Sequence, residues 1–176
     1  MVFSIVISIV ILQRLIELVI AKRNEKWMRS QGAFEVGAAH YPIMVAMHMG
    51  FFISLLAEVI LFNRSLSSVW VLFLVIFLVA QVARIWCLFS LGKFWNTKII
   101  ILPGADVVQK GPYKWIRHPN YVIVTTELLV LPLMFGAYLT AIIFTLLNVW
   151  MLSVRIPTEE KALKEATNYS KKFSLE

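Results

Sequence analysis

The chain has 176 residues, of which 60% are hydrophobic and only 15% are charged, and its mean hydropathy is +0.78. An ordinary soluble domain is roughly 45–50% apolar and about 25% charged, so a single soluble domain of this length could not bury so much apolar surface. The single cysteine, Cys87, excludes an intrachain disulfide framework and a cysteine-rich metal centre, and we predict no metal site. We attribute the net charge of +7 to basic loops beside anionic lipid, and expect no nucleic-acid partner.

Five apolar blocks make up most of the chain, and their lengths suit membrane-spanning helices. They are residues 2–21, 43–62, 69–91, 121–135 and 138–154. The first block has 20 residues, and a helix of that length extends about 30 Å, the thickness of the hydrocarbon layer. We therefore predict an all-α integral membrane protein with about five transmembrane helices, folded as one membrane domain over residues 1–176.

The last two apolar blocks are shorter than the others and nearly contiguous. They have 15 and 17 residues and are separated by Gly136 and Ala137, with Pro132 close before them. This arrangement predicts a tight C-terminal helical hairpin whose spans are short or tilted. Beyond the hairpin, residues 158–170 contain mostly helix formers, with acidic residues early and lysines later, which predicts a further helical segment.

The distribution of basic residues predicts the orientation in the membrane. Fourteen of the 17 lysines and arginines lie in residues 22–40, in residues 92–120, or from residue 155 onward. Loops rich in lysine and arginine stay on the cytoplasmic side. We therefore expect a protein of the plasma (inner) membrane, with its N-terminus outside and its C-terminus and long polar segments on the cytoplasmic side.

Ionisable residues within apolar blocks are candidates for function, because burying a charge in a membrane is costly unless it is paired. The six such residues are Arg14, Glu17, His48, Glu58, Arg84 and Glu127. The first two are three positions apart, and we interpret them as an ion pair. We interpret the histidine as a hydrogen-bonded packing residue, and Glu58 and Arg84 as members of structural pairs. For Glu127 two alternatives stay open, lining a cavity or pairing with a neighbouring span.

The strongest local pattern is GPYKWIRHPNY at residues 111–121. Its Gly-Pro pair favours a turn, and Pro119 fixes one backbone torsion just before the fourth apolar block. The segment is therefore rigid, cationic and aromatic, and lies at the membrane interface. Aromatic and basic side chains collect at that interface in many membrane proteins. Two interpretations follow, a binding loop or an interfacial anchor.

A second charged pattern, RIPTEE at residues 155–160, follows the fifth block. Arg155 and Glu159 are four positions apart and share one face if the helix continues. Pro157 either kinks that helix or begins a new one. The alternative to a functional cluster is a charged cap on the last span. The functional interpretation gains support because the hairpin brings both patterns to the same cytoplasmic edge.

Taken together, these patterns resemble the isoprenylcysteine carboxyl methyltransferase family of integral-membrane enzymes. The family pattern is roughly G-x-Y-x-x-x-R-H-P-x-Y, a hydrophobic hairpin, and then R-x-x-x-E-E. Here it reads Gly111, Tyr113, Arg117, His118, Pro119, Tyr121, Arg155, Glu159 and Glu160. Order, spacing and hairpin match over about residues 92–165. The stretch LGKFWNTKIIILPGADVVQKGPYKWIRHPNY most resembles the small bacterial branch that O-methylates alkylpyrones made by type III polyketide synthases.

The resemblance implies a methyltransferase core in residues 92–176, after three N-terminal helices in residues 1–91, with S-adenosylmethionine as the methyl donor. It places Arg155 toward the acceptor and makes Arg155 and Glu159 the predicted catalytic residues. The cofactor contacts that it implies are Lys98, Ala105, Asp106, Val107, Val108, Tyr113, His118, Pro119, Asn120, Tyr121 and Glu159.

The resemblance therefore implies an S-adenosylmethionine-dependent O-methyltransferase whose acceptor is a lipophilic small molecule, reached among membrane lipids. An alkylpyrone-like enol or a prenylcysteine-like carboxylate is ionised near neutral pH, so the protein needs no strong base, and Arg155 would orient the oxyanion. Two alternatives belong to other classes. One is a membrane NADPH-dependent reductase, because sterol-reductase-type proteins carry a related R-H-P/C-P-x-Y loop. The other is a non-catalytic membrane scaffold.

Overall fold

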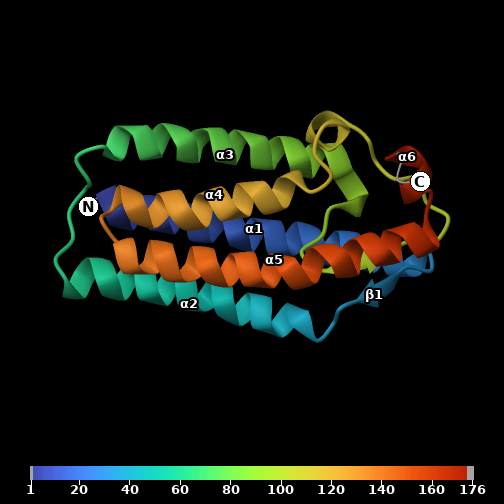
Figure 1. Ribbon diagram of the computed structural model, residues 1–176, viewed down its shortest axis with the longest axis horizontal. Helices are drawn as coiled ribbons and strands as arrows, with labels where there is room; N and C mark the ends of the chain where they lie inside the picture. The colour runs from blue at the N-terminus through green and yellow to red at the C-terminus, as the bar shows by residue number, and fades with distance from the viewer. Residues whose placement is uncertain (1, 174–176) are drawn as a thin grey trace. The chain divides into compact units, whose positions relative to one another are not determined.

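The computed structural model describes residues 2–173 and is built mainly from α-helices (Figure 1). The long helices are α1 (Val2–Ser30), α2 (His40–Leu61), α3 (Trp70–Leu91), α4 (Pro119–Met134) and α5 (Tyr138–Ala166). The short elements are strands β1 (Phe34–Val36) and β2 (Ile99–Ile101), 3-10 turns η1 (Gly92–Phe94) and η2 (Gly111–Lys114), and helix α6 (Tyr169–Lys172). The predicted all-α fold class is confirmed.

Four helices within residues 2–173 are long and apolar enough to cross a membrane, namely α1, α2, α5, and α3 together with η1. Helix α4 is apolar but has 16 residues, about 24 Å at 1.5 Å per residue, which agrees with the prediction of a short or tilted span. Large apolar side chains such as Leu61 and Phe89 are exposed, as expected where lipid covers the helices. Helix α1 continues beyond its apolar block to Ser30, because residues 22–30 contain no proline or glycine.

The chain divides into two units. The first unit takes its described residues from 2–38, 91–108 and 158–173, and the second from 39–90 and 109–157. The first unit therefore contains α1, both strands, the end of α5 and α6. The second contains α2, nearly all of α3, α4 and the first part of α5.

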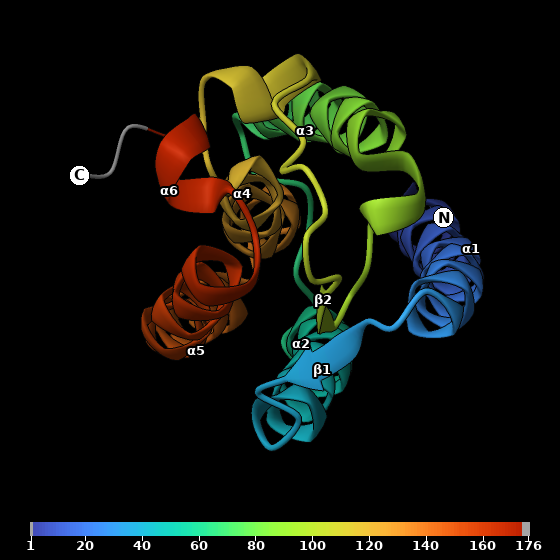
Figure 2. The same cartoon turned by 90° about the vertical axis from the view of Figure 1, so that its right-hand side faces the viewer.

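In the second unit, α4 and the first part of α5 lie side by side as the predicted helical hairpin (Figures 1 and 2). Gly136 turns the chain with a φ of +66°, and the Ala137 N–H donates to the Pro132 carbonyl at 2.9 Å. A left-handed residue commonly ends a helix in this way, and glycine adopts it without a steric penalty. Phe51 of α2 packs edge-on against Phe144 of α5, with ring centroids 5.6 Å apart.

Two buried carboxylates join the helices of the second unit. Glu127 of α4 accepts hydrogen bonds from Arg84 Nε at 2.9 Å and Gln81 Nε2 at 2.7 Å, and pairs with a second guanidinium nitrogen of Arg84. Of the two alternatives for Glu127, the structure therefore shows pairing with a neighbouring helix. Glu58 of α2 accepts from the backbone N–H and hydroxyl of Thr140, at 2.7 and 2.8 Å, and so caps the start of α5.

The three other ionisable residues in the apolar blocks have partners on their own helices. Arg14 Nη1 lies 2.6 Å from Glu17 Oε2, one turn along α1. The His48 ring nitrogen Nδ1 lies 2.8 Å from the Met44 carbonyl oxygen, one turn back along α2. The interpretations of these residues as an ion pair and as a hydrogen-bonded packing residue are confirmed.

In the first unit, β1 and β2 pair antiparallel and form a sheet that the sequence did not predict (Figure 2). Its inner residues Ile99 and Ile101 pack with Ala162 near the end of α5. The segments that pair are three residues long and more than sixty positions apart, which is too short for a recognisable alternation of apolar and polar residues. This sheet fixes the start of the segment that leads to residues 105–108.

Candidate functional site

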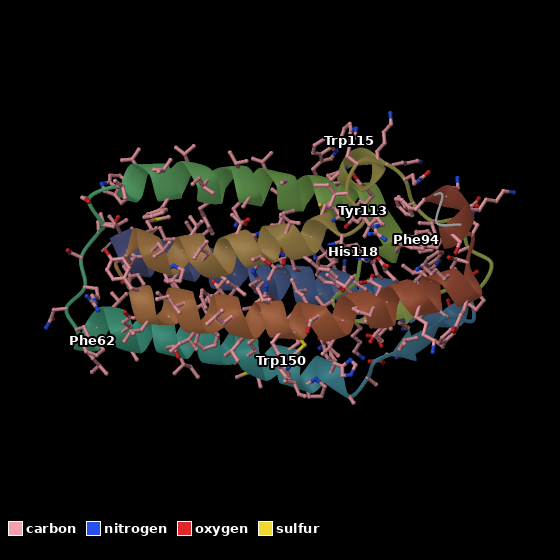
Figure 3. The ribbon with its side chains drawn as sticks, viewed as in Figure 1. Phe62, Phe94, Tyr113, Trp115, His118 and Trp150 are labelled. Atoms are coloured by element: carbon pink, nitrogen blue, oxygen red, sulfur yellow. The ribbon has the colours of Figure 1, made fainter. Side chains whose placement is uncertain are left out.

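The GPYKWIRHPNY segment forms a turn and a helix start in the second unit. Residues Gly111–Lys114 form η2, and α4 begins at Pro119, where a proline suits the first helical turn. Tyr113 is buried, whereas Trp115 is 70% exposed and meets Trp86 of α3 edge-on, with ring centroids 6.0 Å apart. Tyr113, Trp115 and His118 lie at one end of the helices of this unit, and Phe62 lies at the other end (Figure 3).

Tyr121, on the first turn of α4, connects the two sequence patterns. Its ring stacks with that of His118, with centroids 5.4 Å apart and an interplanar angle of 21°. Its hydroxyl accepts a hydrogen bond from Arg155 Nε at 3.4 Å, and the guanidinium carbon lies 5.9 Å from the ring centroid. Arg155 is 4% exposed. The hairpin therefore brings Arg155 to Tyr121, 34 positions earlier in the chain, on which His118 is stacked.

Helix α5 continues through Pro157 and ends at Ala166. Arg155 and Glu159 therefore lie one turn apart on one helical face, and Glu159 is half-buried. The alternative in which Pro157 begins a new helix is wrong. The predicted helix over residues 158–170 is confirmed in its first part, and α6 begins three residues after α5 ends.

Two consecutive hydrogen bonds, which sequence reasoning missed, hold the backbone carbonyl of Tyr121. Asn148 of α5 is 2% exposed, and its Nδ2 donates to Thr125 Oγ1 at 2.8 Å. The Thr125 hydroxyl in turn donates to the Tyr121 carbonyl at 2.8 Å. A polar residue in the middle of the fifth apolar block was the available signal for Asn148, because such residues are rarely left without a partner.

The strip Ala105–Val108 belongs to the first unit and has no regular secondary structure. Its Val107 N–H donates to Asn168 Oδ1 at 2.9 Å, and Asn168 Nδ2 donates to the Asp106 carboxylate. Asn168 follows the end of α5 and was not a candidate in the sequence, where nothing distinguishes it from other polar residues near the C-terminus.

Lys98 stands between two carboxylates of the first unit. Its Nζ lies 3.0 Å from Glu25 Oε1 and 3.2 Å from Glu35 Oε2, and Arg29 contacts both carboxylates as well. Partial burial acts to lower the pKa of Lys98, but the hydrogen bonds and charges of Glu25 and Glu35 outweigh it and raise this pKa. Lys98 therefore helps to join α1 to the sheet, and its contact with a cofactor stays a prediction.

The predicted site residues are thus divided between the units. The second unit holds Tyr113, His118, Pro119, Asn120, Tyr121 and Arg155, and the first holds Lys98, Ala105, Asp106, Val107, Val108 and Glu159. Among the described residues, Asn120 Oδ1 is a buried oxygen with no hydrogen-bond partner. Residues 2–173 contain no group of three or more His, Cys, Asp or Glu side chains placed to hold a metal ion.

Comparisons with known proteins agree with the resemblance of these patterns. A sequence model of the isoprenylcysteine carboxyl methyltransferase (ICMT) family matches residues 70–165, which include both patterns in full. The uncharacterized protein YpbQ of Bacillus subtilis is 48% identical over 163 residues, covering 93% of this chain and 97% of that protein. An uncharacterized protein of Haemophilus influenzae is 30% identical over 151 residues, covering 85% of this chain and 88% of that protein. No solved structure matches the chain.

Proposed function

The chain belongs to the isoprenylcysteine carboxyl methyltransferase family of membrane methyltransferases, and on this premise we propose that it is an S-adenosylmethionine-dependent O-methyltransferase acting on a lipophilic acceptor. The observation that carries the proposal is the contact of Tyr121 with both His118 and Arg155. Residues from the two family patterns therefore meet at one end of the hairpin. An interfacial anchor alone would not require a buried arginine to reach the start of α4.

The residues near Tyr121 fit the proposed methyl donor. Asn120 Oδ1 is a buried acceptor without a partner among the described residues, and buried polar atoms of this kind are normally satisfied. The amino and hydroxyl groups of S-adenosylmethionine are the kind of donors that this oxygen lacks. The aromatic rings of Tyr113 and Tyr121 suit the positive charge of a sulfonium. We assign these residues, with His118 and Pro119, to the donor site of the second unit, whereas the role of Glu159 in the first unit rests on the family resemblance alone.

When bound, S-adenosylmethionine supplies a methyl group on sulfur, and transfer forms an O–CH3 bond while the S–CH3 electron pair returns to sulfur and leaves S-adenosylhomocysteine. The protein's own contribution is then orientation and exclusion of water, and orientation alone is worth about 7–11 kcal/mol. Arg155 is a permanent cation that holds the acceptor oxyanion in line, and the Tyr121 hydroxyl keeps its guanidinium in place at 3.4 Å. Because the acceptor is already ionised, no side chain has to remove a proton.

We propose that the acceptor is an alkylpyrone-like enol or a prenylcysteine-like carboxylate. Both carry an ionised oxygen on a long apolar chain, which a membrane-embedded site can receive from the lipid. We place the site on the cytoplasmic side of the plasma (inner) membrane and the N-terminus outside, because fourteen of the 17 basic residues lie in segments that this topology puts inside. The polar donor then arrives from the cytoplasm.

The test is methyl transfer by the full-length protein in lipid nanodiscs, with a radiolabelled methyl donor and either a long-chain alkylpyrone or a farnesylcysteine analogue. We expect label in one of the two products, and binding of S-adenosylhomocysteine by calorimetry. Arg155→Ala should lower kcat/KM by about a hundredfold, comparable to removal of one oxyanion donor, while binding of S-adenosylhomocysteine changes little.

Lys161→Ala is the matched control, because Lys161 lies on the same helix and its side chain is 79% exposed. It should leave transfer and binding at wild-type values. Transfer to neither acceptor, together with no binding of S-adenosylhomocysteine, would refute the proposal. Thermal stabilisation by NADPH but not by S-adenosylhomocysteine would favour the reductase alternative instead.

A further inference from the structure

We propose that Asn168 is a positioning residue that holds the strip Ala105–Val108 in the conformation that binds the methyl donor. This inference rests on the proposed function, since it concerns binding of the same methyl donor, and the family resemblance is what assigns the strip to that donor. Asn168 lies beyond residues 70–165, the part of the chain that the family model matches. Asn168, Asp106 and Val107 all belong to the first unit.

Residues 104–108 are attached at two backbone positions to residues 166–168, at and just beyond the end of α5. The Gly104 N–H donates to the Ala166 carbonyl at 2.9 Å, and the Val107 N–H donates to Asn168 Oδ1 at 2.9 Å. The Ala105 N–H donates locally to the Leu102 carbonyl at 3.2 Å. The backbone N–H groups on both sides of Ala105 and Asp106 are therefore bound by residues 166–168. The segment itself has no helix or strand that would hold it.

Asparagine suits this position because its amide has one acceptor and one donor group. Asn168 Oδ1 accepts from the Val107 backbone, while Nδ2 donates to the Asp106 carboxylate. Aspartate could accept from the Val107 N–H, but its charge would repel the Asp106 carboxylate. Alanine could make neither of the two hydrogen bonds. The amide thus fixes both the backbone and the one charged side chain of the strip.

Asn168 is itself held in place by its neighbours. Tyr169 is 2% exposed, its hydroxyl donates to Glu160 Oε1 at 3.3 Å, and its backbone N–H donates to Thr167 Oγ1 at 3.3 Å. The ring of Phe173 packs on Tyr169, with centroids 4.9 Å apart. Because these contacts fix the backbone next to Asn168, its side-chain amide can restrict the strip and does not simply move with it.

A strip held in this way loses less conformational freedom when it binds a ligand than a free loop does. Its backbone groups can then make hydrogen bonds to the donor without first being ordered. Releasing the Val107 N–H and the Asp106 carboxylate should therefore weaken donor binding while leaving the acceptor site of Arg155 unchanged. Loss of hydrogen bonds of this kind corresponds to a change of about tenfold in affinity.

The experiment compares wild type, Asn168→Ala, Asn168→Asp and the exchange variant Asp106→Asn/Asn168→Asp in full-length protein in nanodiscs. The exchange variant keeps both hydrogen bonds, since the new asparagine donates to the new aspartate, which still accepts from Val107. Lys171→Ala is the control, because Lys171 is an exposed residue of α6. The measurements are amide hydrogen exchange of residues 104–108 without ligand, the Kd of S-adenosylhomocysteine, and the KM of donor and acceptor.

We expect the Val107 amide hydrogen to exchange faster in Asn168→Ala and Asn168→Asp than in the wild type. Both variants should raise the donor KM and the Kd of S-adenosylhomocysteine by about tenfold. The acceptor KM should stay at the wild-type value, and the Val107 amide of the exchange variant should recover the slow exchange of the wild type. A residue with a merely structural role would not separate the two KM values in this way.

The inference is overturned if Asn168→Ala exchanges and binds like wild type, if both KM values rise together, or if the Val107 amide of the exchange variant exchanges as fast as that of Asn168→Ala. Failure of the proposed function is recognised separately, because it shows in the wild type. Wild-type protein that binds no S-adenosylhomocysteine refutes both proposals, whereas wild-type protein that binds it and an Asn168→Ala variant that binds it equally well refute only this one.

Discussion

The ion pair between Arg84 of α3 and Glu127 of α4 gives the sharpest prediction on stability. The side chain of Arg84 is 4% exposed and that of Glu127 is 9% exposed. Replacing Glu127 by methionine leaves a buried guanidinium without its carboxylate, which costs about 3–5 kcal/mol. For a chain of this length, about 2–4 °C per kcal/mol converts that cost into a fall in Tm of roughly 10 °C.

The double variant Arg84→Met/Glu127→Met should be far less harmful than either single variant. Removing both charges together eliminates the desolvation cost, and such replacements are often neutral or stabilising. A small cost remains because Gln81 Nε2 loses the carboxylate oxygen at 2.7 Å, a loss of about 1 kcal/mol. Since each single variant should cost at least about 3 kcal/mol, the double-mutant cycle should give a coupling energy of about 5 kcal/mol or more between Arg84 and Glu127.

The assay is unfolding of the purified protein in mixed detergent micelles, followed by tryptophan fluorescence and far-UV circular dichroism. The control cycle uses Lys161 and Glu165, whose side chains are 79% and 67% exposed at an N···O distance of 4.0 Å. That pair should give a coupling energy of about 0.5 kcal/mol or less. Additive effects of the Arg84 and Glu127 replacements, with a coupling energy no larger than that of the control pair, would refute the reasoning.

Three smaller predictions concern other contacts. Glu58→Gln should lower the free energy of unfolding by about 1 kcal/mol in the same assay, because it weakens a charged cap at the start of α5. Gly111→Ala should destabilise more than Gly92→Ala by about 1–3 kcal/mol, because both glycines have a φ of +54° but a Cβ at 111 would lie 2.1 Å from Ser90 Oγ. Equal losses for the two glycine variants would show that backbone strain alone decides the cost. The difference in Tm between wild type and Lys98→Met should stay constant from about pH 6 to 9 and shrink above about pH 10.5, because the raised pKa of Lys98 keeps its ion pairs until pH exceeds the unfolded value.

The helices could be predicted because each depends on a local property of the sequence. Long apolar blocks identify the spans, and Gly136 with Pro132 marks the hairpin turn, since these signals act within a few residues of each other. The pairing of Glu127 could not be decided in the same way. Its partners Arg84 and Gln81 lie on another helix, and apolar periodicity does not specify which helices are neighbours.

The main features that the sequence did not predict are contacts between short segments that lie far apart in the chain. The pairing of β1 with β2 and the link from Asn168 to Val107 each join residues at least sixty positions apart. Neither has a periodic pattern, and asparagine occurs in many loops for reasons of turn geometry. The family resemblance identified the strip at 105–108 as a candidate but carried no information on what holds it.

The meeting of Arg155 with Tyr121, by contrast, follows from the length of the hairpin. From Tyr121 to the end of α4 at Met134 the helix rises about 20 Å, and from Tyr138 to Arg155 in α5 it rises about 26 Å. The arms differ by about one turn, a distance that the long side chain of Arg155 can bridge as it reaches back to the tyrosine hydroxyl. Asn148 and Thr125 then fix the relative height of the two arms through the Tyr121 carbonyl. The spacing between the two family patterns is therefore a geometric requirement of the site, because a change of length in one arm alone would separate Arg155 from Tyr121.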